Sequence, residues 1–308
     1  MSELQEMPSV APEVPEVPPV EEGGPEENKL PLLTVARERY AALAELLKHP
    51  AGTGDADFVH DVRVATRRLG EVARMAANVR GVLDKPSAKA VQSSLKAVRQ
   101  SMGTLRDADV VTEHLLKWRM PARVKEVART LAELHATQRA ELGKAADAQI
   151  QSASFSGTMV ILARILEQPP ETSERIEKEM QGALLDLIRK RRRQVRKAFG
   201  KAASKQTAES LHAARIFVKK LRYLVELSQA FVRGAGKEVH VLKQFQQLLG
   251  DHHDVHVIEE QLERQIRKTT PAPRNLGVAW RKWHREMERA QAKRAAEFLM
   301  KSYAWINQ

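Results

Sequence analysis

The residues best suited to chemistry in this chain are a histidine followed by regularly spaced cations, a pattern that is present twice. The first copy, VHDVRVATRRL, spans residues 59–69, and the second, LHAARIFVKKLRY, spans residues 211–223. At an offset of 152 residues the matched pairs are His60 with His212, Arg63 with Arg215, Arg67 with Lys219, Arg68 with Lys220, and Leu69 with Leu221. Guanidinium and ammonium groups at this spacing favour the binding of an anion, because they pair with phosphate and carboxylate oxygens.

A second motif follows each copy of the first. LKAVRQSMGTLRDADV, residues 95–110, aligns with LKQFQQLLGDHHDVHV, residues 242–257, at an offset of 147. The two segments share a leucine, a lysine, a glutamine, a glycine, an aspartate and a valine in the same order. Two ordered motif pairs with nearly the same offset indicate that the chain contains a duplicated unit.

On a helix, positions 0, +3, +7 and +10 of the first motif share one face. In the second copy these positions are His212, Arg215, Lys219 and Arg222. The first copy has Gly70 at +10, and Arg74 returns to the face at +14. Such a stripe would be roughly 10 Å long, and its like charges would repel by a few tenths of a kcal/mol per pair until an anion neutralised them. The alternative is a charged face that contacts only solvent.

Further cations could extend the stripes. Lys96 and Arg99, followed by Arg106, form a second basic edge in the first half, and Lys243 repeats Lys96 in the second half. A third basic run, RKRRR at residues 189–193, continues to Arg196. Consecutive positions cover all sides of a helix, so not all of this run can face one ligand. Arg189, Arg192, Arg193 and Arg196 share a face, and we count Arg189, Arg193 and Arg196 among the candidate site residues. A solvated helix end explains the run equally well.

The histidines do not form a recognised metal pattern. His60 and His212 lie beside arginines, and we expect them to be neutral because like charge lowers a histidine pKa. Each would bond a ligand oxygen, orient a neighbour, or serve as a half-buried structural residue. Residues 252–256 hold three histidines and Asp254, but their spacing is not that of a zinc site. We expect Asp107 and Asp254 to cap a helix or orient an arginine, and we predict no metal ion.

Composition points to a polyanionic partner. The 308 residues carry a formal net charge of +12 and 43% hydrophobic residues, enough for a core. There is no cysteine, which excludes disulfides, thiolate metal sites and a cysteine nucleophile. No apolar run of about 18 residues is present, so we expect no membrane span. The start of the chain lacks a secretion signal, which favours a cytoplasmic protein.

The chain divides into an acidic segment and two helical halves. Residues 1–30 hold eight Glu and one Lys among many prolines, and we expect them to be disordered or extended. This segment could screen the basic site or simply aid solubility. Periodicity of three and four predicts an all-α protein with halves at 31–168 and 171–308. The expected helices lie near 33–48, 56–81, 87–102, 107–118, 122–150, 157–167, 173–199, 206–232, 236–249, 254–267 and 276–304, with Gly103, Gly200 and Gly250 among the separators.

These motifs resemble the conserved histidine α-helical domain (CHAD) family, across about residues 31–308. The family pattern is H-x-x-R-x-x-x-(K/R)-(K/R)-L-R, followed by a helix ending near L-G-x-x-(R/H)-D-x-D. The resemblance implies two pseudo-symmetric four-helix bundles with a basic cleft or pore between them. It also implies binding of inorganic polyphosphate, often at polyphosphate granules. The chain departs from the pattern at Gly70, Met102 and His256.

We therefore expect non-catalytic polyphosphate binding by cations of both halves, without a cofactor. The expected polyphosphate-binding residues are His60, Arg63, Arg67, Arg68, Lys96, Arg99, Arg106, Arg189, Arg193, Arg196, His212, Arg215, Lys219, Lys220, Arg222 and Lys243. The alternative is a nucleic-acid-binding protein that grips the phosphate backbone without reading bases. Aromatic residues make up only 5% of the chain, so stacking platforms would be scarce. A third hypothesis is an enzyme that uses His60 or His212 as a phosphoryl carrier. The sequence leaves the oligomeric state open.

Overall fold

The computed structural model describes residues 32–51, 55–167, 170–269 and 275–306. The acidic segment predicted to be disordered or extended lies outside these residues. The described residues form an all-α fold, as the periodicity predicted. Its helices are α1 (Leu32–Leu46), α2 (Ala56–Ala76), α3 (Lys85–Lys117), α4 (Ala122–Ile150), α5 (Ala153–Leu166), α6 (Pro170–Lys205), α7 (Ala208–Ser228), α8 (Ala235–Lys268) and α9 (Leu276–Ile306).

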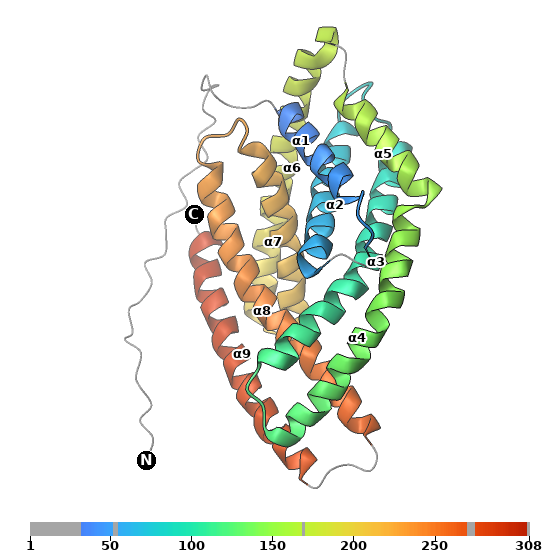
Figure 1. The fold of residues 1–308 in the computed structure, drawn as a ribbon. Coiled ribbons are helices and arrows are strands. Elements are labelled where there is room, and N and C mark those ends of the chain that lie inside the picture. The colour runs from blue at the N-terminus through green and yellow to red at the C-terminus, as the bar shows by residue number, and fades with distance from the viewer. Residues whose placement is uncertain (1–31, 52–54, 168–169, 270–274, 307–308) are drawn as a thin grey trace.

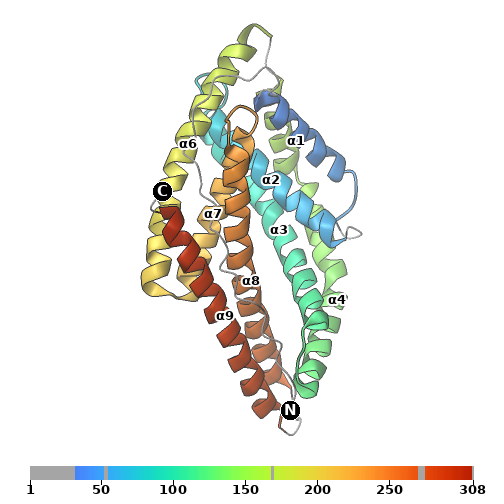
Figure 2. The same cartoon turned by 90° about the vertical axis from the view of Figure 1, so that its left-hand side faces the viewer.

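The helices lie in two groups that follow the order of the chain. We call α1 to α5 the first group and α6 to α9 the second. In Figure 1 α3, α4 and α5 lie on the right and α7 and α9 on the left, while α8 crosses toward the lower end of α4; Figure 2 shows α3 and α4 on one side and α6 and α9 on the other. Helix α2 packs against α1, α3, α6 and α7, and α3 also contacts α8. One cluster of buried side chains includes Leu69 and Leu95 from the first group together with Val218 and Leu242 from the second. The described helices therefore share a core, while the predicted duplication and division into two bundles stay predictions.

Matching caps fix where the two motif helices begin. The Asp55 carboxylate accepts a hydrogen bond from the Phe58 amide at 2.8 Å and starts α2. Thr207 starts α7 in a capping box, in which its hydroxyl accepts from the Ser210 amide at 3.3 Å. Each cap satisfies an amide that has no partner within its helix. Asp55 and Thr207 are 152 residues apart, the same offset as the motifs, so both stripes begin at the same point of their helices.

Two expected helix breaks are absent. The segments predicted near 87–102 and 107–118 form the single helix α3, and those near 236–249 and 254–267 form α8. Gly103 and Gly250 are therefore interior to helices, and Asp107 and Asp254 are not N-caps. Gly200 likewise lies within α6 rather than after it. The sequence-based prediction was wrong here because it assumed that each glycine ends a helix.

Gly103 and Gly250 both face a motif arginine, and at Gly103 the absence of a side chain provides clearance. A Cβ atom at position 103 would lie 2.8 Å from Arg63 Nη1, and one at position 250 would lie 4.0 Å from Arg215 Nε. Arg63 crosses α3 at Gly103 and donates from Nη1 to the Arg99 carbonyl at 2.8 Å. Gly103 thus makes room for Arg63, whereas the distance at Gly250 is an ordinary van der Waals contact that a Cβ atom would tolerate.

A buried carboxylate ties the two groups of helices together. Glu226 on α7 has a side chain only 6% exposed and accepts from Arg68 of α2 at 2.9 and 3.1 Å. Arg222 lies 3.6 Å from the other carboxylate oxygen. Arg39 of α1 donates to the Glu226 carbonyl at 3.4 Å. Three arginines therefore converge on one acidic residue at the junction of α1, α2 and α7.

We expect Glu226→Ala to destabilise the protein by about 3–5 kcal/mol, because it leaves Arg222 and the partly exposed Arg68 without the buried carboxylate that is their counter-charge. Urea unfolding followed by circular dichroism measures the change. The matched control is Glu141→Ala, which removes an exposed partner of Lys144 at 2.8 Å and should change the free energy of unfolding by less than about 0.5 kcal/mol. Equal effects from the two substitutions would contradict a structural role for Glu226.

We expect Gly103→Ala to stabilise the protein less than Gly182→Ala does. Alanine in a helix interior is favoured over glycine by about 1 kcal/mol. At position 182 of α6 a Cβ atom meets nothing within 4 Å, so the gain should appear in full. At position 103 the Arg63 guanidinium must move away from the Arg99 carbonyl, which offsets the gain. Urea unfolding of both variants checks this, and an equal gain at both positions would show that the close approach is harmless.

Candidate anion-binding site

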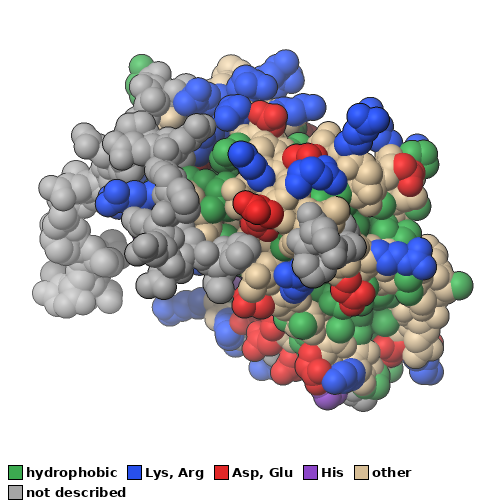
Figure 3. Space-filling view, turned by 90° about the horizontal axis from the view of Figure 1, so that it is seen from above, with side chains coloured by type: hydrophobic (Ala, Val, Ile, Leu, Met, Phe, Trp, Pro, Cys, Tyr) green, Lys and Arg blue, Asp and Glu red, His purple; other side chains and the backbone are tan. Residues whose placement is uncertain are grey.

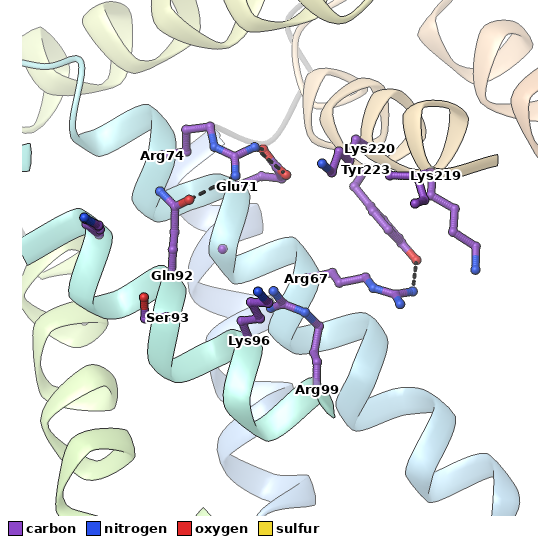
Figure 4. A pocket seen from close by; sticks show the side chains of 13 residues that line it. Arg67, Glu71, Arg74, Gln92, Ser93, Lys96, Arg99, Lys219, Lys220 and Tyr223 are labelled. Carbon is purple, nitrogen blue, oxygen red and sulfur yellow. Dashed lines mark hydrogen bonds and ion pairs between the residues drawn. The ribbon is translucent and has the colours of Figure 1, made fainter. Parts of the chain in front are cut away.

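A cavity lined by cations lies between α2, α3 and α7, where side chains of the first group of helices face those of the second (Figure 4). Its volume is about 540 Å³. We call it the basic cavity, and its lining residues are Arg67, Gly70, Glu71, Arg74, Lys89, Gln92, Ser93, Lys96, Arg99, Ile216, Lys219, Lys220 and Tyr223. Seven of these residues are Lys or Arg and one is acidic. The cavity therefore favours an anion with several charges.

The acidic residue of the basic cavity is occupied by protein partners. Arg74 Nη1 donates to the two carboxylate oxygens of Glu71 at 3.0 and 2.8 Å, and Arg74 Nη2 donates to Gln92 at 3.0 Å. Burial raises the pKa of Glu71, while the neighbouring Arg74 charge opposes that rise. Glu71 thus neutralises about one of the seven cations and orients Arg74 toward α3 (Figure 4).

Tyr223 links the two copies of the basic motif. Its hydroxyl accepts a hydrogen bond from Arg67 Nη1 of α2 at 3.5 Å. Its ring is 3% exposed and lies under the Arg222 guanidinium, 4.8 Å from the ring centroid. Arg67 therefore extends across the space between α2 and α7 (Figure 4). The sequence analysis did not predict Tyr223 as a site residue.

Backbone carbonyls hold two arginines of the first half. Arg63 donates to the Arg99 carbonyl at 2.8 Å, and Arg99 donates to the Thr66 carbonyl at 3.3 Å. Burial, followed by the charge of Arg67, lowers the pKa of both guanidinium groups to about 10. Both remain cationic near neutral pH, and the reciprocal bonds connect α2 to α3.

Lys219 is a cation of the basic cavity whose pKa lies far below the ordinary value for lysine. Burial, and then the charges of Arg215 and Arg67, lower the pKa of its ammonium group to about 6. Near neutral pH this lysine is therefore mostly neutral in the free protein. An anion in the cavity would favour the charged form, because opposite charge raises a lysine pKa. The residue is placed to bind a proton together with an anion.

The two copies of the second motif approach each other beside the basic cavity. Arg215 Nη2 lies 4.0 Å from an oxygen of Asp254 on α8. Burial lowers the pKa of Arg215, and the charges of Asp254 and Asp107 oppose that change. Asp107 lies on α3, so Arg215 lies within the electrostatic reach of an acid from each half. The expectation that these aspartates orient arginines fits this arrangement, whereas the N-cap alternative does not.

The pKa values of His60 and His212 are lowered, as the sequence predicted. Burial lowers the pKa of His60, and the nearby Arg106 charge lowers it further. Burial also lowers the pKa of His212, with Arg215 and Lys219 adding to the effect. Like charge was the expected cause, but burial is the larger one. Neither histidine lines the basic cavity.

The predicted site residues fall into three groups. Arg67, Lys96, Arg99, Lys219 and Lys220 line the basic cavity. A second group lies outside the lining but interacts electrostatically within each motif copy, namely His60, Arg63 and Arg106 in the first and His212 and Arg215 in the second; Arg63 and Arg215 are also influenced by the charge of Arg67 in the cavity. The remaining candidates lie outside the cavity lining, namely Arg68, Arg189, Arg193, Arg196, Arg222 and Lys243.

The candidates outside the lining have other contacts or are exposed. Arg68 and Arg222 pair with Glu226. Arg189 pairs with Asp186 at 2.9 Å, and the Arg196 guanidinium lies over the Trp305 ring. Arg193 and Lys243 are exposed. The expected face of the α6 basic run is thus at the protein surface.

Sequence reasoning missed part of the cavity lining. Lys89, Gln92 and Ser93 lie on the same side of α3 as Lys96 and were not predicted, whereas Arg74 had been placed on the α2 stripe without being named a site residue. A spacing of seven separates Lys89 from Lys96, and also Arg67 from Arg74. Because seven residues make about two helical turns, this spacing could have identified the cavity face.

The described residues carry no other obvious chemical centre. No group of three or more histidine, aspartate or glutamate side chains is placed to hold a metal ion within the described part of the chain. No helix among the described residues is long and apolar enough to cross a bilayer. In the space-filling view from above, several Lys and Arg side chains gather along the edge of the molecule that lies at the top of the picture (Figure 3).

Comparison with known proteins agrees with the fold and the motifs. Two solved structures are similar over nearly the whole chain. The CHAD domain from the plant Ricinus communis has a TM-score of 0.62 and 19% identity, covering 93% of this chain and 97% of that one. PptA from Streptomyces chartreusis has a TM-score of 0.64 and 15% identity, covering 88% and 97%. A search of curated proteins gives no match. The CHAD domain family model matches residues 40–263, and the chain therefore belongs to the CHAD domain family.

Proposed function

We propose that this protein binds inorganic polyphosphate, without catalysis, in the basic cavity. The observation that carries the proposal is the convergence of seven Lys and Arg side chains from α2, α3 and α7 on one cavity, whose single carboxylate is already bonded. Repulsion among these cations is a cost in the free protein that a polyanion removes. The chain belongs to the CHAD family, and the resemblance to that family implied polyphosphate binding, so family membership supports the same ligand.

The extent of the cationic lining favours a chain of phosphates over a single phosphate. Arg67 to Arg74 on α2 and Lys89 to Lys96 on α3 each span seven residues, or about 10 Å along a helix. Lys219 and Lys220 lie opposite them on α7. Cations distributed over this distance can contact several phosphoryl groups at once, whereas one phosphate would leave most of them unpaired.

Nucleic acid fits the basic cavity less well. Among the described lining residues Tyr223 has the only aromatic ring, and that ring is 3% exposed beneath Arg222. A stacking platform for bases needs an accessible ring face. Phosphoryl transfer through a histidine is also not favoured by the geometry, because His60 and His212 lie outside the cavity lining. Binding alone accounts for the arrangement, and a cytoplasmic position at polyphosphate granules belongs to the same proposal.

We expect Lys96→Glu to weaken polyphosphate binding by about tenfold or more, the scale of one charge-assisted contact. The salt dependence of log K should become shallower by about one contact, because fewer counterions are released. Isothermal titration with long-chain polyphosphate at two salt concentrations measures both quantities.

The control for this substitution is Lys144→Glu, which changes the net charge equally at a side chain 74% exposed on α4. If the control weakens binding as much as Lys96→Glu, general attraction rather than the basic cavity holds the polymer. A parallel titration with DNA should show weaker binding than polyphosphate at equal phosphate concentration. Comparable affinity would favour the nucleic-acid alternative.

We expect polyphosphate binding to strengthen as the pH falls from about 9.5 to 7.5, with proton uptake. The Lys219 pKa is about 6 in the free protein and should rise in the complex, so the complex holds more protons over this range. Below about pH 6 the effect should level off, because Lys219 is then charged in both states. Titrations in buffers with different ionisation enthalpies measure the proton uptake.

Lys219→Arg tests the source of that pH dependence. Arginine stays charged over the whole range, so the variant should bind with less proton uptake and a flatter pH profile. The histidines are a small contribution above pH 7.5, since the pKa values of His60 and His212 are lowered. An unchanged profile in Lys219→Arg would contradict the assignment to Lys219.

A further inference from the structure

A second hollow lies on another side of α7, away from the basic cavity. It is formed by the last turns of α6 and the first turns of α7 and has a volume of about 710 Å³. Ala198, Ala213 and Phe217 give it an apolar surface. Lys197, Lys201 and Lys205 also line it, so we call it the lysine groove. It shares no lining residue with the basic cavity.

The lysine groove carries positive charge that its own residues do not neutralise. The three lysines follow each other at every fourth position of α6 and span about 12 Å. They are exposed, and none pairs with a carboxylate in the described part of the chain. Glu209 also lines the groove, and hydrogen bonds from its own amide and from Thr207 lower its pKa, so it is ionised and offsets one of the three lysine charges. An apolar floor with a basic edge suits an acidic segment that also carries apolar side chains.

The sequence before α1 contains such a segment. Residues 12–22, PEVPEVPPVEE, repeat with a period of three. A polyproline II helix has three residues per turn and a rise of about 3.1 Å per residue. In that conformation Val14, Val17 and Val20 would share one edge, and Glu13 and Glu16 would share another, about 9 Å apart. That spacing lies within the 12 Å covered by the lysines.

The start of α1 places this segment within reach of the groove. The amides of Leu32 and Leu33 donate to the Glu177 carboxylate of α6, the latter at 2.9 Å. From Glu177 to Lys197 the distance along α6 is about 30 Å. Fourteen residues lie between Val17 and Leu32, and they can span about 46 Å when extended. Val17 can therefore reach the groove while α1 stays bonded to α6.

We propose that residues 12–22 dock in the lysine groove of their own chain. The valine edge would contact Ala213 and Phe217, and the glutamates would pair with the lysines of α6. The acidic segment then covers a basic surface beside α7 and leaves the basic cavity open. This proposal does not depend on the proposed function, because the two sites have no residue in common.

Disulfide trapping tests the proposal in the full-length protein, which contains no cysteine of its own. The test pair is Val17→Cys with Ala213→Cys, in the lysine groove. The control pair is Val17→Cys with Ile216→Cys, only three residues further along α7 but in the basic cavity. Under a mild oxidant, we expect the test pair to form an intrachain disulfide about tenfold faster than the control pair, because docking raises the local concentration.

A variant with two of the groove lysines reversed in charge tests whether the lysines hold the acidic segment. Adding Lys201→Glu and Lys205→Glu to the test pair should reduce its rate to that of the control pair, with an unchanged far-ultraviolet circular dichroism melt. Equal rates for the two pairs would overturn the proposal. Faster trapping at position 216 would instead place the acidic segment in the basic cavity, and covalent dimers would mean docking on a second copy. A loss of polyphosphate binding alone would leave these rates unchanged, so the two proposals fail separately.

Discussion

The structure depends on holding many like charges close together without an excess of acids. Seven Lys and Arg side chains surround a cavity of about 540 Å³, and Glu71 is the one carboxylate among its lining residues. Backbone carbonyls, rather than acidic side chains, accept hydrogen bonds from two of the arginines: Arg63 donates to the Arg99 carbonyl, and Arg99 donates to the Thr66 carbonyl. A carbonyl stabilises a guanidinium through its dipole without cancelling the charge. The cavity therefore keeps its positive potential while its arginines stay ordered.

In the first copy of the basic motif, neighbouring residues face the basic cavity and the helix junction. Arg67 faces the basic cavity, whereas Arg68 turns to the buried carboxylate of Glu226 and ties α2 to α7. On a helix, adjacent residues point about 100° apart, so a run of cations is divided between faces by geometry alone. In the first copy, one of the two consecutive cations contributes to the cavity and the other fixes the helix that presents it. In the second copy both Lys219 and Lys220 line the cavity, so this division holds for the first copy alone.

The ionisation of Lys219 is a consequence of placing many basic residues close together. Lys219 is buried among arginines and has a pKa of about 6, so it is mostly neutral near pH 7. It therefore adds little to the positive charge of the free cavity. Its counterpart in the first half, Arg67, is a residue type that cannot lose its proton near neutral pH. Matching positions of the two motif copies thus hold chemically different basic residues, Arg67, which stays charged near neutral pH, and Lys219, whose charge depends on its surroundings.

The sequence alone determined the helical class, the repeated motifs and the cationic character, because each follows from spacing and composition within one segment. It also indicated Arg67, Lys96, Arg99, Lys219 and Lys220, five cations that line the basic cavity. It could not decide which cations turn away, since Arg68 finds its partner Glu226 at a distance of 158 residues in the chain.

Nor could the sequence reveal that Gly103 serves as clearance for Arg63, because the close approach arises only when α2 packs on α3. Glycine is a helix breaker by local propensity, and tertiary contact overrides that propensity here. The pKa of Lys219 likewise depends on burial between helices of both halves. Spacing along the chain sets the face on which a charge lies, while packing between distant helices sets its partners, its burial and its ionisation.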